Sequence, residues 1–105
     1  MATSKEFLNY VFEQLSMPDE IAFRPMMGEY LVYYRGRLVG DICDDRLFIK
    51  PVPTALEMMP QAELAPPYKG AKDMIVADVD DGEFLRGLFE AIYDELPVPK
   101  PRKKK

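Results

Sequence analysis

The chain has 105 residues, with 14 Lys and Arg, 18 Asp and Glu, one cysteine and no histidine, which is enough for a single domain. One cysteine excludes an internal disulfide, and without histidine there is no Cys/His zinc site and no Ser–His or Cys–His nucleophile pair. The charge is uneven, because five basic residues fall among the last nine: Lys100, Arg102, Lys103, Lys104 and Lys105. The sequence therefore predicts an acidic folded domain over residues 1–96 and a basic, flexible Pro/Lys-rich tail over residues 97–105.

The N-terminal segment predicts an amphipathic helix over about 4–16. Thr3 and Glu6 have the spacing of a capping box, and apolar residues follow at helical intervals. The segment lacks the basic and apolar regions of a signal peptide. No apolar run approaches the roughly 20 residues that span a bilayer. We therefore expect a cytoplasmic protein with a reduced thiol and no membrane contact.

The middle of the chain predicts an antiparallel meander. A short strand over 21–23 is expected to stop or bend at Pro25. Arg35-Gly36 and Asp44-Asp45 read as tight two-residue turns. They separate three segments rich in aliphatic and aromatic residues, 30–34, 37–43 and 46–50. These segments are expected to form three consecutive strands.

The second half predicts a short helix, a loop, a strand and a long helix. Thr54 and Glu57 resemble a capping box for a helix over 54–59 that ends at Pro60. A surface loop over 60–72 and a strand over 74–79 should follow. Asp80 and Glu83 are expected to cap a final helix, whose apolar stripe is Phe84, Leu85, Leu88, Phe89, Ile92 and Leu96. The fold class is α+β, a single domain in which an antiparallel meander sheet is packed on one face by the N- and C-terminal helices.

Two-residue turns also predict which side chains share a face of the sheet. Tyr34 would pair with Arg37, and Leu31 would face Gly40. The helix-covered face would then carry Leu31, Tyr33, Leu38, Ile42, Leu47 and Ile49. The opposite face would carry Tyr30, Val32, Tyr34, Arg37, Val39, Asp41, Cys43, Arg46, Phe48 and Lys50. Two interpretations of this mixed face stay open: the 60–72 loop and the short helix cover it, or it is an exposed aromatic patch for a partner.

The stretch from Arg24 to Lys50 resembles the N-terminal domain of the bacterial TfoX/Sxy competence-regulator family. The family carries an Arg-x-Met-Phe-Gly segment, a Gly-containing hairpin turn and an Asp-x-Leu-Tyr-Leu-Lys strand, and the matching residues here are Arg24, Met26, Gly28, Gly36, Leu47 and Lys50. Met27 replaces the usual Phe, Glu29 stands where a second Gly is common, and Phe48-Ile49 stand for Tyr-Leu. The resemblance covers roughly residues 5–96. It implies a small α+β domain, a link to transcriptional control of DNA uptake, and no catalytic residues. The larger regulators add a second, helical domain, whereas this chain continues into its basic tail.

These observations favour a non-enzymatic, TfoX-like regulatory or interaction domain that works through a protein partner. The candidate contact residues are Arg24, Met26, Gly28, Tyr30, Tyr34, Phe48 and Lys50. Arg24 and Lys50 have the alternative roles of capping carbonyls or pairing with carboxylates such as Asp41 or Glu29. No cofactor or metal is expected, since Asp44-Asp45 is a turn and the acidic residues over 78–81 lie at a helix start.

Two alternative functions remain open. The tail residues Lys100 and 102–105 are suited to weak, sequence-independent contact with nucleic acid. A small molecule could instead bind between the sheet and the 60–72 loop. Cys43 is expected to be inert, because the chain offers it no histidine partner.

Overall fold

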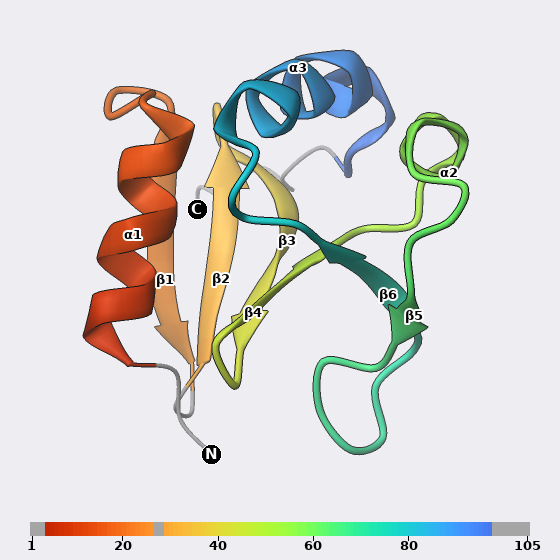
Figure 1. Ribbon diagram of the computed structural model, residues 1–105, viewed down its shortest axis with the longest axis horizontal. Helices are drawn as coiled ribbons and strands as arrows, with labels where there is room; N and C mark the ends of the chain where they lie inside the picture. The colour runs from red at the N-terminus through yellow and green to blue at the C-terminus, as the bar shows by residue number, and fades with distance from the viewer. Residues whose placement is uncertain (1–3, 27–28, 98–105) are drawn as a thin grey trace, which may run out of the picture.

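The protein is an antiparallel six-stranded sheet with three helices (Figure 1). This computed structural model describes residues 4–26 and 29–97, so Gly28 and the tail residues 98–105 lie outside the described residues. The strand order is β1 (Ile21–Met26), β2 (Glu29–Tyr34), β3 (Arg37–Cys43), β4 (Arg46–Ile49), β6 (Met74–Ala77) and β5 (Leu64–Ala65). The helices are α1 (Lys5–Leu15), α2 (Pro53–Met58) and α3 (Gly82–Ile92), and a 3₁₀ turn, η1 (Tyr93–Glu95), follows α3. The predicted α+β class is confirmed.

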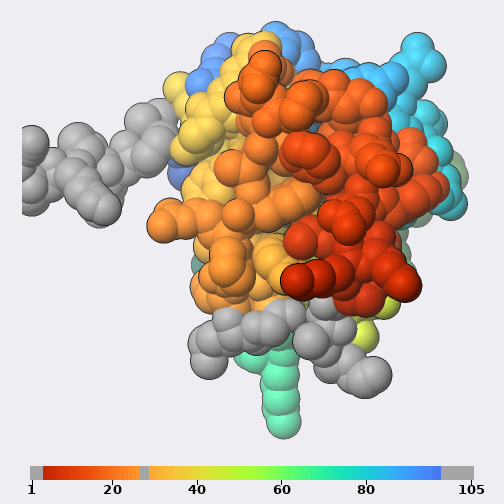
Figure 2. Space-filling view, turned by 90° about the vertical axis from the view of Figure 1, so that its left-hand side faces the viewer, coloured from red at the N-terminus to blue at the C-terminus, as the bar shows by residue number. Residues whose placement is uncertain are grey.

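Helices α1 and α3 cover one face of the sheet, which we call the inner face. The space-filling view shows α1 lying beside β1 on the surface (Figure 2). The main hydrophobic core fills the space between these two helices and the sheet. Its largest fully buried side chains are Tyr34, Phe89, Leu15, Ile42, Leu47, Ile49, Ile75, Leu85, Leu88, Ile92 and Val11. The apolar stripes of the two long helices are therefore the parts that the sheet buries.

Both predicted hairpin turns are confirmed. Arg35 and Gly36 have φ values of 50° and 85°, and Asp44 and Asp45 have φ values of 55° and 59°. Positive φ at both central residues is the property of the turn whose twist matches that of paired strands. Tyr34 accordingly pairs with Arg37, as the sequence predicts.

A β-bulge at Val39 corrects the predicted faces. Tyr33 pairs with Leu38, but Val32 pairs with Gly40, so Val39 is an extra residue on β3. Leu31 consequently pairs with Asp41 and not with Gly40. Since an extra residue reverses the alternation of side chains, two sets of residues are exchanged relative to the prediction. Tyr30, Val32, Tyr34 and Val39 belong to the inner core, while Leu31, Tyr33 and Leu38 face the other way and are only half-buried.

Both edge strands differ from expectation. β1 continues through Pro25 to Met26, because an edge strand pairs on one side only and tolerates a residue without an N–H. The predicted 60–72 loop contains β5, whose Leu64 pairs with Ile75 of β6. Two residues are too few for a sequence pattern to signal a strand.

The helix caps also differ in detail from the prediction. The Ser4 hydroxyl accepts a hydrogen bond from Phe7 N at 3.1 Å, and Asp81 accepts one from Phe84 N at 3.1 Å. The predicted cap residue Thr3 lies outside the described residues. Asp80 instead accepts the Tyr10 hydroxyl at 2.5 Å, which ties α1 to the start of α3.

The start of α2 is capped from a distant part of the chain. Thr54 N donates to the Glu95 carboxylate at 2.9 Å, and the Thr54 hydroxyl bonds to the same group. The predicted capping box with Glu57 is therefore wrong, because Glu95 takes that place. These bonds hold the pKa of Glu95 below its ordinary value.

Candidate functional site

The outer face of the sheet, opposite α1 and α3, carries one continuous cross-strand row. Residues that pair across antiparallel strands point to the same face. The successive pairs run from Arg24 on β1 to Val76 on β6 through Leu31, Asp41 and Phe48. The row therefore has a cation at the sheet edge and a carboxylate at its centre.

Asp41 is the charged residue that the fold buries. It is 8% exposed, and within the described ranges no other polar or charged residue is classed as buried. Its flanking neighbours in the row, Leu31 and Phe48, are apolar. Among residues 4–26 and 29–97, none donates a hydrogen bond to the Asp41 carboxylate and none forms an ion pair with it within 4.0 Å. Among the described residues no side-chain N or O atom is both fully enclosed and without a hydrogen-bond partner, so the Asp41 oxygens keep some access to solvent and the carboxylate loses only part of its hydration.

The electrostatic surroundings of Asp41 are mixed. Burial raises the pKa of the Asp41 carboxyl above its ordinary value, the positive charge of Lys50 opposes that rise, and the negative charge of Glu29 adds to it. Desolvation is the largest of these effects. The ionised carboxylate is thus held at a cost in free energy that a bound donor or cation would offset.

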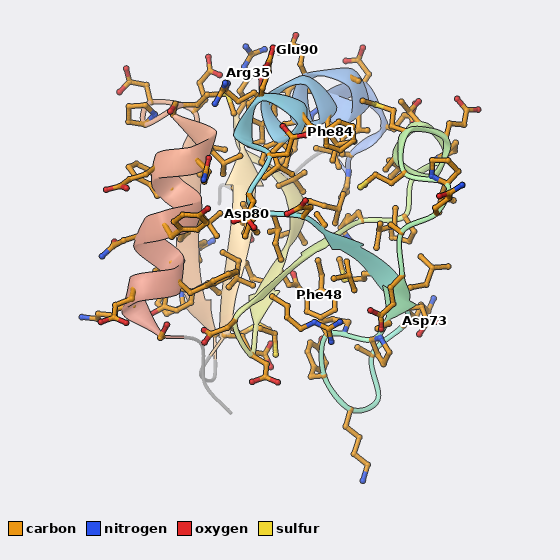
Figure 3. The ribbon with its side chains drawn as sticks, in the orientation of Figure 1. Arg35, Phe48, Asp73, Asp80, Phe84 and Glu90 are labelled. Atoms are coloured by element: carbon orange, nitrogen blue, oxygen red, sulfur yellow. The ribbon has the colours of Figure 1, made fainter. Side chains whose placement is uncertain are left out.

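A cavity of about 380 Å³ lies between the outer face and the loop that follows β5. Leu31, Leu38 and Asp41 line it from the sheet, and the rest of the lining consists of Lys50, Pro51, Pro67, Tyr68, Ala71, Lys72, Asp73 and Met74. Asp73 marks the loop side of this region, next to β5 and β6 (Figure 3). A cavity of this size, with apolar walls and a few polar groups, is typical of a small-molecule site.

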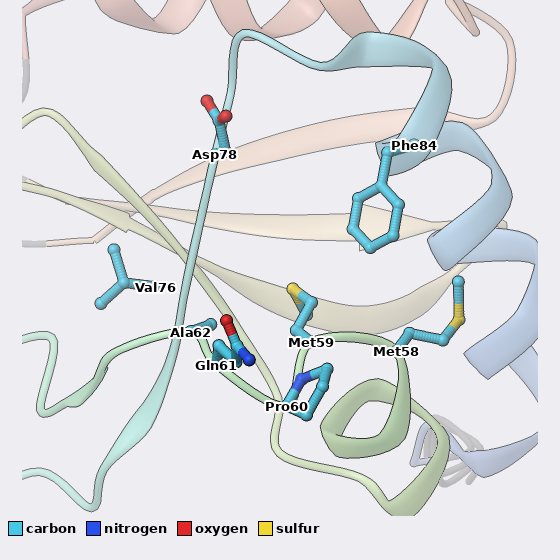
Figure 4. A pocket seen from close by; sticks show the side chains of 8 residues that line it. All are labelled: Met58, Met59, Pro60, Gln61, Ala62, Val76, Asp78 and Phe84. Carbon is cyan, nitrogen blue, oxygen red and sulfur yellow. The ribbon is translucent and has the colours of Figure 1, made fainter.

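A second cavity, of about 430 Å³, lies between α2, β6 and α3 (Figure 4). Its lining is mostly apolar and includes Met58, Met59, Pro60, Gln61, Ala62, Val76, Asp78 and Phe84. The Asp78 carboxylate already accepts a hydrogen bond from Asp80 N at 2.9 Å, and Gln61 is exposed. The polar groups of this cavity are thus paired or exposed, whereas the first cavity contains Asp41, a largely buried residue whose carboxylate has no hydrogen-bond partner among the described residues. The Asp41 cavity is therefore the better candidate site.

The predicted aromatic contact residues are not exposed together. Tyr34 is 1% exposed on the inner face, where its hydroxyl donates to Glu90 at 2.7 Å. Tyr30 packs against the same core. Phe48 does lie on the outer face, as predicted, but it is 2% exposed and packs in a cluster with Cys43 and Met74.

The interpretation that the 60–72 loop covers the outer face agrees with this packing. Ala65, from that segment, packs against the cluster of Cys43, Phe48 and Met74. The short helix α2 packs against α3 and not over Phe48. Among the described residues, the 60–72 segment therefore covers the part of the outer face around Phe48, and the Asp41 cavity lies between this segment and the sheet.

The candidate residues Arg24, Met26 and Lys50 do share the outer face with Asp41. Pairing of Arg24 with Leu31 and of Met26 with Glu29 places both residues there, and Lys50 lines the cavity. Arg24 is exposed, and its guanidinium carbon lies 5.9 Å from the centre of the Tyr33 ring. The predicted pairing of Arg24 or Lys50 with a carboxylate is not found, since the ion pairs of the described residues involve Arg35 and Arg46.

Cys43 is a buried free thiol on the outer face. Burial raises its pKa to about 11, and a hydrogen bond to Glu29 adds to the effect. A thiol with such a pKa holds its proton at neutral pH and is a poor nucleophile. Within the residues that the structure describes, no group of three or more His, Cys, Asp or Glu side chains could hold a metal ion.

Comparison with known proteins reveals one informative relative. The chain is 36% identical over 107 residues to an uncharacterized 12.7 kDa protein in the trpE 5′ region of Spirochaeta aurantia, and the match covers 100% of this chain and 93% of that protein. This chain belongs to the family of that 12.7 kDa protein. No family model matches the sequence, and no solved structure matches it.

Asp41 is the site residue that the sequence analysis did not single out. The sequence signal is an acidic residue inside an otherwise apolar strand, Leu38-Val39-Gly40-Asp41-Ile42-Cys43. A charged residue in a central strand is usually exposed on one face of the sheet, and where it is buried it usually has a partner. The bulge and the loop after β5 decide between these outcomes, and neither is visible in the pattern.

No described helix is long and apolar enough to cross a membrane.

Proposed function

We propose that this protein is a non-enzymatic, TfoX-like regulatory domain that binds a small molecule in the Asp41 cavity and acts through a protein partner. One observation carries the proposal: Asp41 is a buried residue, 8% exposed, that lines a cavity of about 380 Å³, and its carboxylate receives no hydrogen bond from the described residues. A ligand that donates to this carboxylate would offset its desolvation.

The burial of the aromatic side chains favours a ligand over an aromatic contact patch. Tyr34 and Phe48 lie inside hydrophobic clusters, so they offer a partner almost no surface. Arg24, Met26 and Lys50, which carry the TfoX resemblance, instead lie on the face that holds Asp41. The residues behind the resemblance and the cavity therefore support one regulatory surface.

Ligand binding would act on the loop that follows β5, and this loop could pass the effect of the ligand on to a protein partner. The loop residues Pro67, Tyr68 and Lys72 line the cavity, and Tyr68 is 43% exposed. A ligand held between the loop and the sheet would stabilise one arrangement of the loop, whose outer surface a protein partner could then contact.

Thermal unfolding of the full chain with a panel of metabolites tests the proposal. A ligand present at a hundred times its Kd stabilises the folded state by about 2.7 kcal/mol, which raises Tm by roughly 10 °C in a domain of this size. We expect at least one compound to raise Tm in the wild type and to lose most of that effect in Asp41→Asn. An equal shift in both proteins, or no shift with any compound, would contradict the proposal.

The basic tail supports nucleic-acid contact as a second candidate function. Five basic residues lie within the last nine positions, and five phosphate contacts give a log–log salt slope of about −4.5. Electrophoretic shift across a salt series, with a 1–96 truncation as control, measures this slope. Equal binding by the full chain and the 1–96 truncation would show that the tail does not contribute. We also propose a cytoplasmic location, which is supported by the single unpaired cysteine.

A further inference from the structure

We propose that the ligand of the Asp41 cavity is a small zwitterion with an apolar side chain, of the size and kind of an aliphatic α-amino acid. This inference rests on the proposed function and names the chemical class that the cavity would select. It follows from three kinds of group that meet at the cavity: the carboxylates of Asp41 and Asp73, the lysine side chains and an apolar wall.

The carboxylate selects a cationic donor. Asp41 is buried and has no donor from the described part of the chain. An ammonium group supplies both a positive charge and several N–H donors, and hydrogen bonds between two charged partners are about twice as strong as neutral ones. The ammonium end of a ligand is therefore expected to lie at Asp41.

The lining carries two carboxylates, Asp41 and Asp73, and two lysines, so it favours a ligand with both charges over a simple cation or a simple anion. Lys50 and Lys72 line the same cavity, and the charge of Lys50 is close enough to act on Asp41 without forming an ion pair within 4.0 Å. A plain amine would meet this repulsion, and a plain carboxylate would lie beside Asp41. A zwitterion avoids both conflicts, because its carboxylate pairs with Lys50 or Lys72 while its ammonium pairs with Asp41.

The remaining lining accepts an aliphatic chain. Leu31 and Leu38 from the sheet and Met74 at the start of β6 contribute apolar surface. The volume of about 380 Å³ is sufficient for a compact amino acid with a branched or thioether side chain. Leucine and methionine are thus the appropriate probes.

Three ligands that differ by one charged group test the assignment by calorimetric titration of the full chain. L-leucine carries both charges, 3-methylbutan-1-amine lacks the carboxylate, and 4-methylpentanoate lacks the ammonium. L-methionine serves as a second zwitterion. We expect L-leucine or L-methionine to bind at millimolar or lower concentration, and both single-charge analogues to bind at least about tenfold more weakly.

Variants locate the two charges. Asp41→Asn and the double variant Lys50→Met/Lys72→Met should each weaken binding of the zwitterion at least about tenfold. Lys69→Met, in the same loop as Lys72 but not in the cavity lining, should not change it. Circular dichroism confirms that each variant is folded. If Asp41→Asn does not fold, comparison of Lys50→Met/Lys72→Met with Lys69→Met still tests whether the cavity lysines bind the ligand carboxylate.

Each outcome bears on a distinct claim. Equal binding of the amine or of the acid would overturn the zwitterion while leaving a ligand-binding function in place. The same holds if the amino acids do not bind but another compound stabilises the wild type and not Asp41→Asn. Absence of binding by every probe, together with no shift in the metabolite panel, would overturn both this inference and the proposed function.

Discussion

The two faces of the sheet handle polar groups in opposite ways. On the inner face, the buried hydroxyl of Tyr34 donates to Glu90 at 2.7 Å, and the Tyr34 ring packs edge-on against Phe89 and Tyr93. On the outer face, Asp41 is buried beside a cavity and receives no hydrogen bond from the described residues. The inner face is thus satisfied by its own chain, and the outer face is incomplete. This contrast between the two faces is the basis of the proposed binding site on the outer face.

The largest expected effect comes from Gly40 on β3, which lies close to the backbone of Phe48 and Ile49 on β4. A Cβ at this position would lie 2.0 Å from the backbone oxygen of Phe48, which no side-chain movement can relieve. We expect Gly40→Ala to lower the free energy of unfolding by at least about 3 kcal/mol, as measured by urea denaturation. Gly87→Ala, on α3 with open space around it, is the matched control and should stabilise by about 0.5–1 kcal/mol. A change below 1 kcal/mol in Gly40→Ala would show that β3 and β4 do not approach this closely.

Leucine truncations compare the packing of the two faces directly. Leu88 is fully buried in the inner core, whereas Leu31 is half-buried beside the Asp41 cavity. Leu88→Ala should cost about 3 kcal/mol, because it leaves a cavity in a closed core. Leu31→Ala should cost about 1 kcal/mol, because part of its surface is already open. Equal losses in denaturant titrations would mean that the outer face is packed as tightly as the inner one.

The pH dependence of stability isolates the cost of Asp41. Because the folded pKa of this carboxyl is raised by burial, its contribution to stability is fully present below the unfolded pKa of about 3.9 and is lost as the pH rises through the folded pKa. Lys50 and Glu29 are the charged groups that act on it. In the absence of ligand, Asp41→Asn should therefore be more stable than the wild type at pH 7, by on the order of 1 kcal/mol.

That advantage should shrink toward pH 4 and below. Thermal melts of both proteins across the pH range provide the measurement. A variant that is less stable than the wild type at pH 7 would indicate that the folded protein already satisfies the carboxylate. Gain of stability with loss of ligand is the pattern expected when a binding group is retained at a cost to the fold.

The smallest effect concerns reactivity and not stability. With a pKa raised to about 11, the Cys43 thiol should react with iodoacetamide at pH 8 at least about a hundredfold more slowly in the folded protein than in urea. Timed alkylation followed by mass spectrometry measures both rates. Comparable rates would show that the cluster around Phe48 opens readily and that the outer face is looser than its burial indicates.

Much of the fold could be predicted from local sequence signals. Arg35-Gly36 and Asp44-Asp45 mark both hairpin turns, and the apolar spacing marks both long helices. The bulge at Val39 could not be predicted, because valine fits a strand equally well as a paired or an extra residue. That one residue decides which face Tyr34 and Leu31 occupy.

The candidate site was predictable in place but not in its central residue. A small-molecule site between the sheet and the 60–72 loop is one of the alternatives that the sequence leaves open. The burial of Asp41 and its place beside the cavity depend on three contacts with other parts of the chain. These are pairing with Leu31, pairing with Phe48, and the loop that follows β5. Long-range packing of this kind leaves no periodic trace in the sequence.

The two ends of the sheet have a consequence for how copies of the molecule meet one another. At one end, β1 contains Pro25, which has no N–H to offer to an added strand. At the other end, β5 is only the two residues Leu64–Ala65. Neither edge presents a long, regular row of free backbone groups, so pairing of strands between molecules is disfavoured at both ends. The sheet is built to stop at six strands, which protects a chain rich in β-forming residues from fibril growth.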